Sequence, residues 1–302
     1  MQAPLGPAAT LELVGAVCAS GALGTLAGSW TPAGELGEQV RALRALSEEP
    51  FCVNLVLRFE QRERLICALQ AGATIVSFSW GVDAELIGLA RDFGAFVLVQ
   101  VGTAGEARAA TVAGADALIV QGVEAGGHLQ ATRPLVELVQ EIRRWLQIPL
   151  VAAGGIADPA SVNEALDAGA DAVACGTVFL AAAEADLHPT YLDRLIAANA
   201  SDTTVTNVFD GGWPDAPHRV IRNNTVTVWE ACGMPKPGLR PGESEPIATR
   251  NGHPVLRYAI TQPTRDTTGE IGLMAMYAGT SVRAIHRREP ASQIIERLAT
   301  RP

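Results

Sequence analysis

The chain has 302 residues, of which 48% are hydrophobic and 18% charged, and its formal net charge is −9. This composition supports a large buried core and excludes a disordered chain, while the acidic balance argues against a nucleic-acid partner. Every long apolar run is interrupted before the ~18 residues that a membrane helix needs. The start, "MQAPLGPAAT", has neither the basic nor the apolar region of a signal peptide. We therefore expect a cytoplasmic protein that has no membrane partner.

The cysteines give no pattern for metal binding. None of them forms a C-x-x-C pair, and zinc and iron–sulfur sites lack the spacing that they need. We expect reduced thiols that act as small hydrophobic residues, and no metal site. The five are Cys18, Cys52, Cys67, Cys175 and Cys232.

The first part of the chain predicts three strands and one clear helix. The strands are "APL" (residues 3–5), "GTLAG" (24–28) and "FCVNLVL" (51–57). Between the last two, "TPAGELGEQVRALRALSE" predicts a helix with Thr31 as its N-cap and Pro32 at its first position. The chain thus begins with alternating strands and helices.

A repeated pattern follows, in which a helical stretch ends in Gly-Ala and a short apolar strand comes at once. Its copies are "LQAGATIVSFSWG", "RDFGAFVLVQVG", "TVAGADALIVQG" and "LDAGADAVACGT". Glycine just past a helix end takes the left-handed conformation, and strands with little alternation are typical of a parallel sheet buried on both faces. With "PLVAAGG" (149–155) the chain has eight strands, which predicts an α/β fold, the (β/α)8 TIM barrel. An open α/β sheet is the alternative. The glycines are Gly72, Gly94, Gly114 and Gly169.

The alternation of strands and helices stops after the eighth predicted strand. Residues 185–268 are rich in Pro, Gly, Asn and Thr and predict a helical and loop-rich insertion that covers one side of the barrel. Two later segments, "EIGLMAMYAGTSVRAI" (270–285) and "ASQIIERLA" (291–299), predict closing helices. We expect a barrel from residues 1–184 and 269–302, with an insertion or lid subdomain between them.

The loops after the seventh and eighth predicted strands favour a phosphate. Barrel enzymes carry their sites at the carboxyl ends of the strands, and phosphate groups often sit after strands seven and eight. Gly154 and Gly155 allow backbone N–H groups to approach an anion, and Gly176 and Thr177 lie where a helix begins. The hydroxyl of Thr177 adds a donor. The two loops predict a phosphate-bearing ligand, with two ordinary turns as the alternative.

The loop after the sixth predicted strand, "GVEAGGHLQ", holds the best candidate for chemistry. Gly126 and Gly127 let the backbone pass close to a flat ligand, or adopt a shape closed to other residues. His128 would face that ligand and act as acid, base or hydrogen-bond donor near neutral pH; a histidine that caps a turn is the alternative. We expect Glu124 to support the loop. Four other histidines are interpreted as surface or insertion residues: His188, His218, His253 and His286.

Further polar residues stand at the predicted strand ends. The buried amide of Asn54, inside "VNLVL", needs a hydrogen-bond partner, and a ligand would supply one. Gln100 and Gln121 end their strands and would reach a ring edge or a ribityl hydroxyl. The segment "YAGTS" (277–281) opens the last part of the chain and would add donors to a phosphate.

These motifs resemble those of the nitronate monooxygenase family, formerly called 2-nitropropane dioxygenases. The resemblance covers nearly the whole chain and is most specific in "QGVEAGGH", "AAGGIAD", "GADAVACGTVFL", "FDGGWPDAPHRV" and "MYAGTS". The first three are shared with the flavin barrels that include the FMN-dependent enoyl-acyl-carrier-protein reductases. The resemblance implies a (β/α)8 barrel that holds non-covalent FMN and needs neither a metal nor NAD(P)H.

The resemblance also implies which residues form the site. His128 matches the active-site histidine of the family. Gln100 stands where many relatives have lysine, and Leu5 stands in for the usual methionine beside the flavin. The residues that would bind FMN are Leu5, Gly6, Asn54, Gln100, Gln121, Gly126, Gly127, Gly154, Gly155, Gly176, Thr177, Tyr277, Gly279 and Ser281.

The implied reaction is the oxidative denitrification of an alkyl nitronate, such as propionate 3-nitronate, by O2 to a carbonyl compound and nitrite. His128 would accept the α-proton of a neutral nitroalkane or orient the bound nitronate. The alternatives are an FMN-dependent NAD(P)H:quinone or enoyl-thioester reductase, a sugar-phosphate isomerase or lyase, and a non-catalytic flavin-binding relative. The physiological substrate and the oligomeric state, with a homodimer as one option, are left open. The first strand is nearly absent, so either the start codon is misassigned or the barrel opens with a stub.

Overall fold

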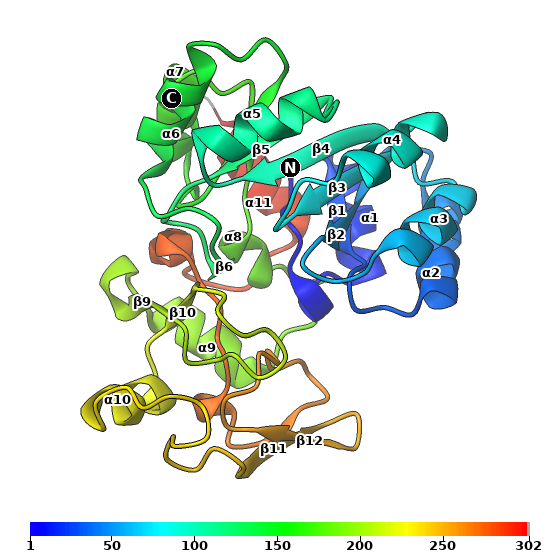
Figure 1. Ribbon diagram of the computed structural model, residues 1–302. Coiled ribbons are helices and arrows are strands. Elements are labelled where there is room, and N and C mark those ends of the chain that lie inside the picture. Colours follow the sequence, from blue (N-terminus) through cyan, green and yellow to red (C-terminus); the bar gives the residue numbers. More distant parts are fainter. Residues whose placement is uncertain (301–302) are drawn as a thin grey trace.

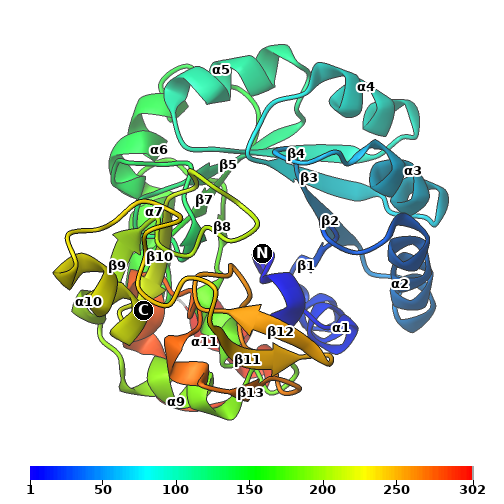
Figure 2. The same cartoon turned by 60° about the horizontal axis from the view of Figure 1, so that its bottom comes forward.

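Seven parallel strands form one curled sheet with helices on its outer side in the computed structural model, which describes residues 1–300 (Figures 1 and 2). The strand order follows the chain, without the reversal of a doubly wound sheet. The predicted barrel class is therefore confirmed, and the open sheet is wrong. The strands are β1 (Gly24–Ala27), β2 (Phe51–Val56), β3 (Ile75–Ser79), β4 (Phe96–Val101), β5 (Ala117–Gln121), β7 (Leu150–Ala153) and β8 (Ala172–Ala174).

Glycines and capping residues mark the ends of the helices between the strands. Gly72, Gly94, Gly114 and Gly169 have φ of 101°, 79°, 95° and 110°, as the Gly-Ala pattern predicts. The predicted N-cap Thr31 is wrong, because Pro32 keeps a non-helical ψ of 141° and is itself the cap. The helices are α1 (Leu11–Ala19), α2 (Ala33–Leu46), α3 (Arg62–Gln70), α4 (Ala84–Asp92), α5 (Ala104–Val112), α6 (Leu135–Arg143), α7 (Pro159–Asp167) and α8 (Thr177–Leu180).

The first residues of the chain lie between β8 and β1, where the barrel closes. Gln2 forms an isolated parallel bridge with Cys175, and its N–H donates to Leu23 O at 2.8 Å. The buried Gln2 side chain accepts from Thr25 N at 2.8 Å. The predicted strand at residues 3–5 is wrong, because the chain turns there into the 3-10 helix η1 (Gly6–Ala8). In place of a strand, the chain before β1 thus contributes a single isolated bridge to the barrel.

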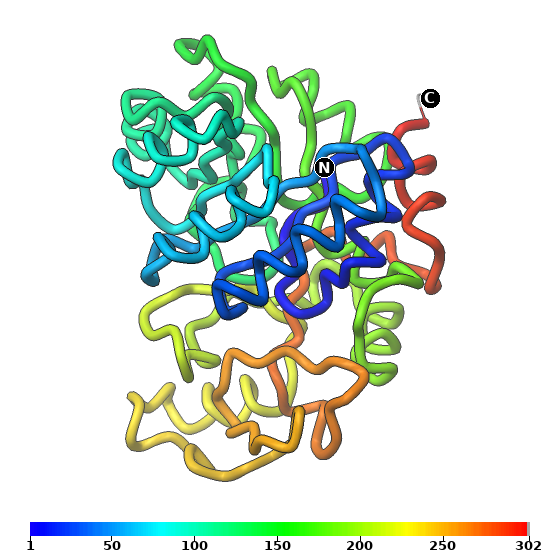
Figure 3. The backbone as a smooth tube through the Cα atoms, turned by 90° about the vertical axis from the view of Figure 1, so that its right-hand side faces the viewer, coloured from blue at the N-terminus to red at the C-terminus, as the bar shows by residue number. Residues whose placement is uncertain are grey.

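Two small antiparallel sheets, made mostly of strands that follow β8, cover the carboxyl end of the barrel, where Figures 1 and 3 show them as a second layer. The short strand β6 (Gly127–His128), which comes after β5, pairs with β10 and so joins the two layers. The prediction of a helical and loop-rich segment missed these strands, and the boundaries at 185 and 268 stay a prediction. The elements are α9 (Pro189–Ala197), the 3-10 helix η2 (Ala200–Asp202), β9 (Thr203–Thr206), β10 (His218–Ile221), α10 (Asn224–Ala231), β11 (Pro246–Arg250), β12 (His253–Leu256) and β13 (Thr268–Gly269).

The segment from residue 270 to 285 is not the predicted helix. It forms two 3-10 helices, η3 (Ile271–Leu273) and η4 (Thr280–Ala284), joined by an extended stretch in which Tyr277 bridges Val220. The apolar side chains of that stretch are buried because it passes through the core. The last predicted helix is confirmed as α11 (Ala291–Ala299), which packs against α1 and α7.

The five cysteines are free thiols. Cys18, Cys52 and Cys175 are buried, as expected of small hydrophobic residues, but Cys67 is half-buried and Cys232 is exposed. Within residues 1–300, no group of three or more His, Cys, Asp and Glu side chains could hold a metal ion. In the same part of the chain, no helix has the length and apolar character needed to cross a membrane.

Candidate active site at the carboxyl end of the barrel

The structure brings the predicted site residues to one end of the barrel. Asn54 lies near the end of β2, and Gln100 and Gln121 lie at the ends of β4 and β5. The two predicted phosphate loops follow β7 and β8. Because all these strands are parallel, their carboxyl ends share one rim, where barrel enzymes carry their sites.

Two glycines bring the histidine loop and the C-terminal segment into backbone contact. A Cβ on Gly126 would lie 2.4 Å from Gly279 N, and a Cβ on Gly279 would lie 2.6 Å from Glu124 O. Thr280 N donates to Glu124 O at 2.9 Å across the same contact. Gly127 has a φ of 73°, which side chains resist. The close approach at Gly126 is therefore to protein backbone, and a contact of this pair with a flavin stays a prediction.

The predicted phosphate loops fit an anion. Gly154 and Gly155 have φ of 121° and 72°, and among the hydrogen bonds of residues 1–300 none uses the N–H of Gly155 or Gly176. The hydroxyl oxygen of buried Thr177 accepts from Gly279 N at 2.9 Å, which leaves its hydrogen free to donate. These groups are unused donors after the neighbouring strands β7 and β8, and a phosphate would require such donors; we call them the proposed phosphate cradle.

Other predicted contacts lie at the edge of this cradle. A Cβ on Gly176 would lie 3.7 Å from the Leu5 side chain, and Gly6, with a φ of 56°, opens η1. Ser281 is buried in η4. Tyr277 does not act as a phosphate donor here, because its hydroxyl donates to Ile260 O at 2.9 Å.

The strand-end amides are hydrogen-bonded to the protein itself. Gln100 Nε2 donates to Gln130 Oε1 at 2.9 Å, and Gln121 Oε1 accepts from Gln130 N at 2.8 Å. Gln121 Nε2 also donates to His128 O at 3.2 Å, and Asn54 Nδ2 donates to Ser77 Oγ at 3.0 Å. Gln100 and Gln121 thus fix the loop that carries His128, whereas Asn54 joins β2 to β3, and the contact of these amides with a cofactor stays a prediction. Sequence reasoning missed Gln130, whose only signal is a polar side chain two residues after His128.

His128 lies in β6 opposite His218 of β10, and its ring stacks on Trp213. The two ring centroids are 4.0 Å apart with an angle of 16° between the planes. The ring of Tyr277 lies 5.5 Å away. His128 Nε2 is buried and finds no hydrogen-bond partner in residues 1–300. Burial, and secondly the neighbouring His218, lower the pKa of His128 to about 3, so this ring is neutral and has an unused nitrogen.

His218, which we interpreted as a surface or insertion residue, falls within the predicted insertion but does not lie at the surface. It is fully buried, its Nδ1 lies 2.9 Å from Ala216 O, and its Nε2 accepts from Phe209 N at 3.3 Å. The proton therefore sits on Nδ1, and burial lowers the pKa of His218. Its two bonds hold the loop from Phe209 to Ala216 against His128. Of the other histidines, His188 caps α9, and His253 and His286 are exposed as predicted.

Glu124 supports the histidine loop, in the role that the sequence indicates. Its carboxylate accepts from Leu135 N at 3.1 Å and so caps the start of α6. Arg219 of β10 donates to Val123 O at 2.8 Å from the other side. The loop is thus held by the barrel and by the covering layer together.

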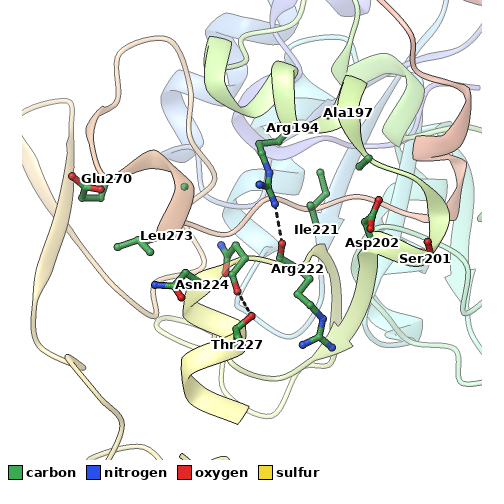
Figure 4. Close-up of a pocket in the computed structure, with 13 residues that line it drawn as sticks. Arg194, Ala197, Ser201, Asp202, Ile221, Arg222, Asn224, Thr227, Glu270 and Leu273 are labelled. Atoms are coloured by element: carbon green, nitrogen blue, oxygen red, sulfur yellow. Dashed lines mark hydrogen bonds between the residues drawn. The ribbon is translucent and has the colours of Figure 1, made fainter. Parts of the chain in front are cut away.

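Two surface clefts of about 760 and 560 Å³ lie away from these residues. The larger lies between α9, β10 and α10, and Figure 4 shows the Arg194 side chain pointing to the carbonyl of Arg222, at 3.0 Å. The smaller is lined by arginines next to α11. None of the predicted site residues lines either cleft, so we place the candidate site at the rim of the barrel.

A family model described as nitronate monooxygenase matches residues 1–65 and 59–301. The chain belongs to the nitronate monooxygenase family. This confirms the resemblance that the motifs indicate. A nitronate monooxygenase of Paraburkholderia phytofirmans is 27% identical over 346 residues, which covers 99% of this chain and 90% of that protein.

A (3aS,4S,5R,7aS)-5-hydroxy-7a-methyl-1-oxo-octahydro-1H-indene-4-carboxyl-CoA dehydrogenase of Mycobacterium tuberculosis is 33% identical over 234 residues. That match covers 76% of this chain and 65% of the dehydrogenase, so the chain spans just under two thirds of that relative's length. Relatives of this chain thus carry names of more than one redox reaction, and similarity alone does not choose among them.

Two solved structures share the whole fold. FabK from Thermotoga maritima has a TM-score of 0.81 at 27% identity and covers 98% of this chain and 90% of its own. A nitroalkane oxidase from Streptomyces ansochromogenes also has a TM-score of 0.81, at 30% identity, and covers 99% and 93%. These neighbours confirm the barrel together with the layer that covers it.

We expect Gly279→Ala to lower the free energy of unfolding by about 1–3 kcal/mol, because overpacked contacts cost this much. The new Cβ would lie 2.6 Å from Glu124 O, which is backbone and cannot move aside alone. Urea unfolding measures the change. The control is Gly15→Ala in α1, where a Cβ meets no atom within 4 Å and should be neutral or stabilising. Equal stability of Gly279→Ala and the wild type would contradict the backbone contact.

We expect His128 to make the fold sensitive to acid. Its pKa is about 3 in the folded chain and 6.5 in an ordinary histidine. Between these values the unfolded chain binds a proton that the folded chain does not, so stability is full above pH 6.5 and is lost as pH falls toward 3. The slope is at most about 1.4 kcal/mol per pH unit.

Denaturant unfolding is measured across this pH range. The free energy of unfolding of His128→Phe should fall less steeply with decreasing pH than that of the wild type. The control His253→Gln, at an exposed site, should follow the wild type. Parallel curves for wild type and His128→Phe would show that His128 titrates normally.

Proposed function

We propose that this protein is an FMN-dependent oxidoreductase that converts alkyl nitronates, such as propionate 3-nitronate, and O2 to a carbonyl compound and nitrite. The observation that carries the proposal is His128, a buried neutral imidazole with an unused Nε2 at the rim of the barrel. Family membership supports it, as does the likeness to proteins named nitronate monooxygenase and nitroalkane oxidase.

FMN fits the donors at this rim. The unused N–H groups of Gly155 and Gly176 and the free hydroxyl hydrogen of Thr177 would hold its phosphate. The loop that carries His128 would lie beside its ring. When bound, FMN supplies the acceptor for an electron from the nitronate and the route of that electron to O2.

Of the two roles open to His128, its surroundings favour orientation of a nitronate anion over removal of a proton from a neutral nitroalkane. A histidine with a pKa of about 3 is a weak base, because the charged ring would be buried without a partner. A nitronate arrives already deprotonated. The N–H of the neutral ring would donate to one of its oxygens, and the negative charge would in turn raise the pKa of His128.

The alternative is an FMN-dependent NAD(P)H:quinone or enoyl-thioester reductase. The observation in its favour is the 33% identity to a dehydrogenase whose name includes a carboxyl-CoA group. Both reactions would use the same cofactor cradle, so the substrate and the source of electrons decide between them. A cytoplasmic location, a small-molecule substrate and a homodimer are kept as predictions.

We expect the protein as purified to show the visible absorbance of FMN, to consume O2 with propionate 3-nitronate and to release nitrite. His128→Asn should lower kcat/KM about 10- to 100-fold, as the loss of one hydrogen bond to a charged group does, and should retain FMN. An oxygen electrode and a nitrite assay measure both quantities. The control His253→Asn should keep the wild-type rate, since His253 is exposed. Full activity of His128→Asn would contradict the role given to this residue.

We expect the flavin absorbance to stay unchanged when the protein is mixed with NADH or NADPH under argon. A nitronate supplies its own electrons, so the proposed reaction requires no nicotinamide. A stopped-flow trace at the flavin band measures the change, with anaerobic propionate 3-nitronate as the positive control. Rapid bleaching by NADH, and none by the nitronate, would replace the proposal by the reductase alternative.

A further inference from the structure

Four aromatic side chains form a continuous cluster over the carboxyl ends of β1, β2 and β3, which we call the aromatic wall. It consists of Trp30, Phe59, Trp80 and Trp213. The ring centroids of Trp30 and Phe59 are 5.8 Å apart, those of Phe59 and Trp213 5.4 Å, and those of Trp80 and Trp213 4.9 Å. The rings meet edge to face, the arrangement that aromatic pairs prefer. The first three follow barrel strands, and Trp213 comes from the loop before β10.

The aromatic wall runs from solvent to His128. Trp30 at its outer end is 51% exposed, whereas Trp213 at its inner end is 2% exposed and stacks on the His128 ring. Trp80 also faces His128, with 6.2 Å between the ring centroids. Trp30, Phe59 and Trp80 keep exposed surface, whereas Trp213 is covered by these rings and by His128. A ligand on this side would therefore meet the first three rings.

The backbone of Trp80, in the inner part of the aromatic wall, is strained, and hydrogen bonds hold Trp80 and the loop of Trp213 in place. Trp80 has a φ of 61°, which bulky side chains rarely adopt, and its N–H donates to Gln130 Oε1 at 3.0 Å. The loop of Trp213 is fixed by His218, which accepts from Phe209 N, and by Gly211 N, which donates to Tyr258 O at 2.9 Å. Strained residues held by their surroundings cluster at functional sites.

The chemistry of the aromatic wall is that of neutral, flat, apolar surfaces. Such surfaces stabilise an aromatic or aliphatic group by stacking and by removing it from water. A carboxylate placed against them loses hydration and gains no partner from the rings. Next to the neutral His128, the rings add no charge of their own to the site.

We propose that the aromatic wall binds the substituent of the substrate and selects nitronates that carry an apolar, ring-bearing group over nitronates that carry a carboxylate. The nitronate group would meet His128, and the substituent would lie against the exposed parts of Trp80, Phe59 and Trp30, which Trp213 holds from behind. This inference rests on the proposed function for the identity of the reacting group, but the apolar selection is a property of the four rings.

The test compares kcat/KM for three nitronates: those of nitroethane and 2-phenyl-1-nitroethane, and propionate 3-nitronate. The holoenzyme should prefer the phenyl compound to the carboxylate by about tenfold or more. Trp213→Ala should lower the ratio of kcat/KM for the phenyl compound to that for ethyl nitronate about tenfold, mainly through KM. Trp213→Phe should restore most of this ratio, since it keeps a ring. The control is Trp145→Phe, whose ring packs under Arg108 on another part of the barrel.

A second measurement does not depend on turnover. Binding of nitrobenzene, a flat ligand that is not a nitronate, is followed by perturbation of the flavin spectrum of the holoenzyme. Its Kd should rise about tenfold in Trp213→Ala and stay at the wild-type value in Trp145→Phe. If Trp213→Ala does not fold, the half-exposed Trp30→Ala should shift both quantities in the same direction by less.

The outcomes separate the two proposals. If nitronates are oxidised but propionate 3-nitronate is preferred, or if the ratio and the Kd are unchanged in Trp213→Ala and Trp30→Ala, the aromatic selection is wrong and the proposed function stands. If no nitronate is oxidised but nitrobenzene binding depends on Trp213, the proposed function is wrong and the aromatic wall keeps its role. A tenfold loss in both measurements supports the inference.

Discussion

The contact between Gly126 and Gly279 is the constraint on which the candidate site depends. Because neither residue has a side chain, the histidine loop and the C-terminal segment touch through backbone atoms, and Thr280 N donates to Glu124 O across the contact. The same segment donates from Gly279 N to Thr177, at the start of α8. Three parts of the chain that are far apart in sequence are therefore fixed in one place. The position of His128 follows from this contact as much as from β5.

The layer that covers the barrel completes the site. β10 pairs with β6, which sets the direction of the His128 backbone, and Arg219 holds Val123 O from the same strand. His218, with both ring nitrogens in hydrogen bonds, fixes the loop that presents Trp213 to His128. The barrel supplies the proposed phosphate cradle, and the covering layer supplies the surroundings of the histidine. A truncated barrel would therefore keep the strands and lose the environment that makes His128 neutral.

Local signals made the barrel and its rim predictable from sequence. The left-handed glycines and the strands buried on both faces act within a few residues, and parallel strands then place Asn54, Gln121, Gly155 and His128 on one rim. The failures are non-local. The strands β9 to β13 are short, and all but β10 are partly exposed. Residues 270–285 are apolar because they cross the core, and this pattern resembles that of a buried helix. The burial of His218 and the role of Gln130 depend on pairing between segments about 90 and 30 residues apart, and no local pattern records such a pairing.

The groups around His128 favour a ligand that already carries a negative charge. A neutral imidazole between His218 and Trp213, with Tyr277 and Trp80 nearby, offers rings and one N–H. Such surroundings are poor at creating a charge on a substrate by proton transfer, because the imidazolium would be desolvated. They suit a substrate that brings a delocalised negative charge of its own, since that charge stabilises the protonated ring and attracts its N–H. The low pKa of the histidine and the aromatic surface beside it thus favour the same kind of ligand, a nitronate with an apolar substituent.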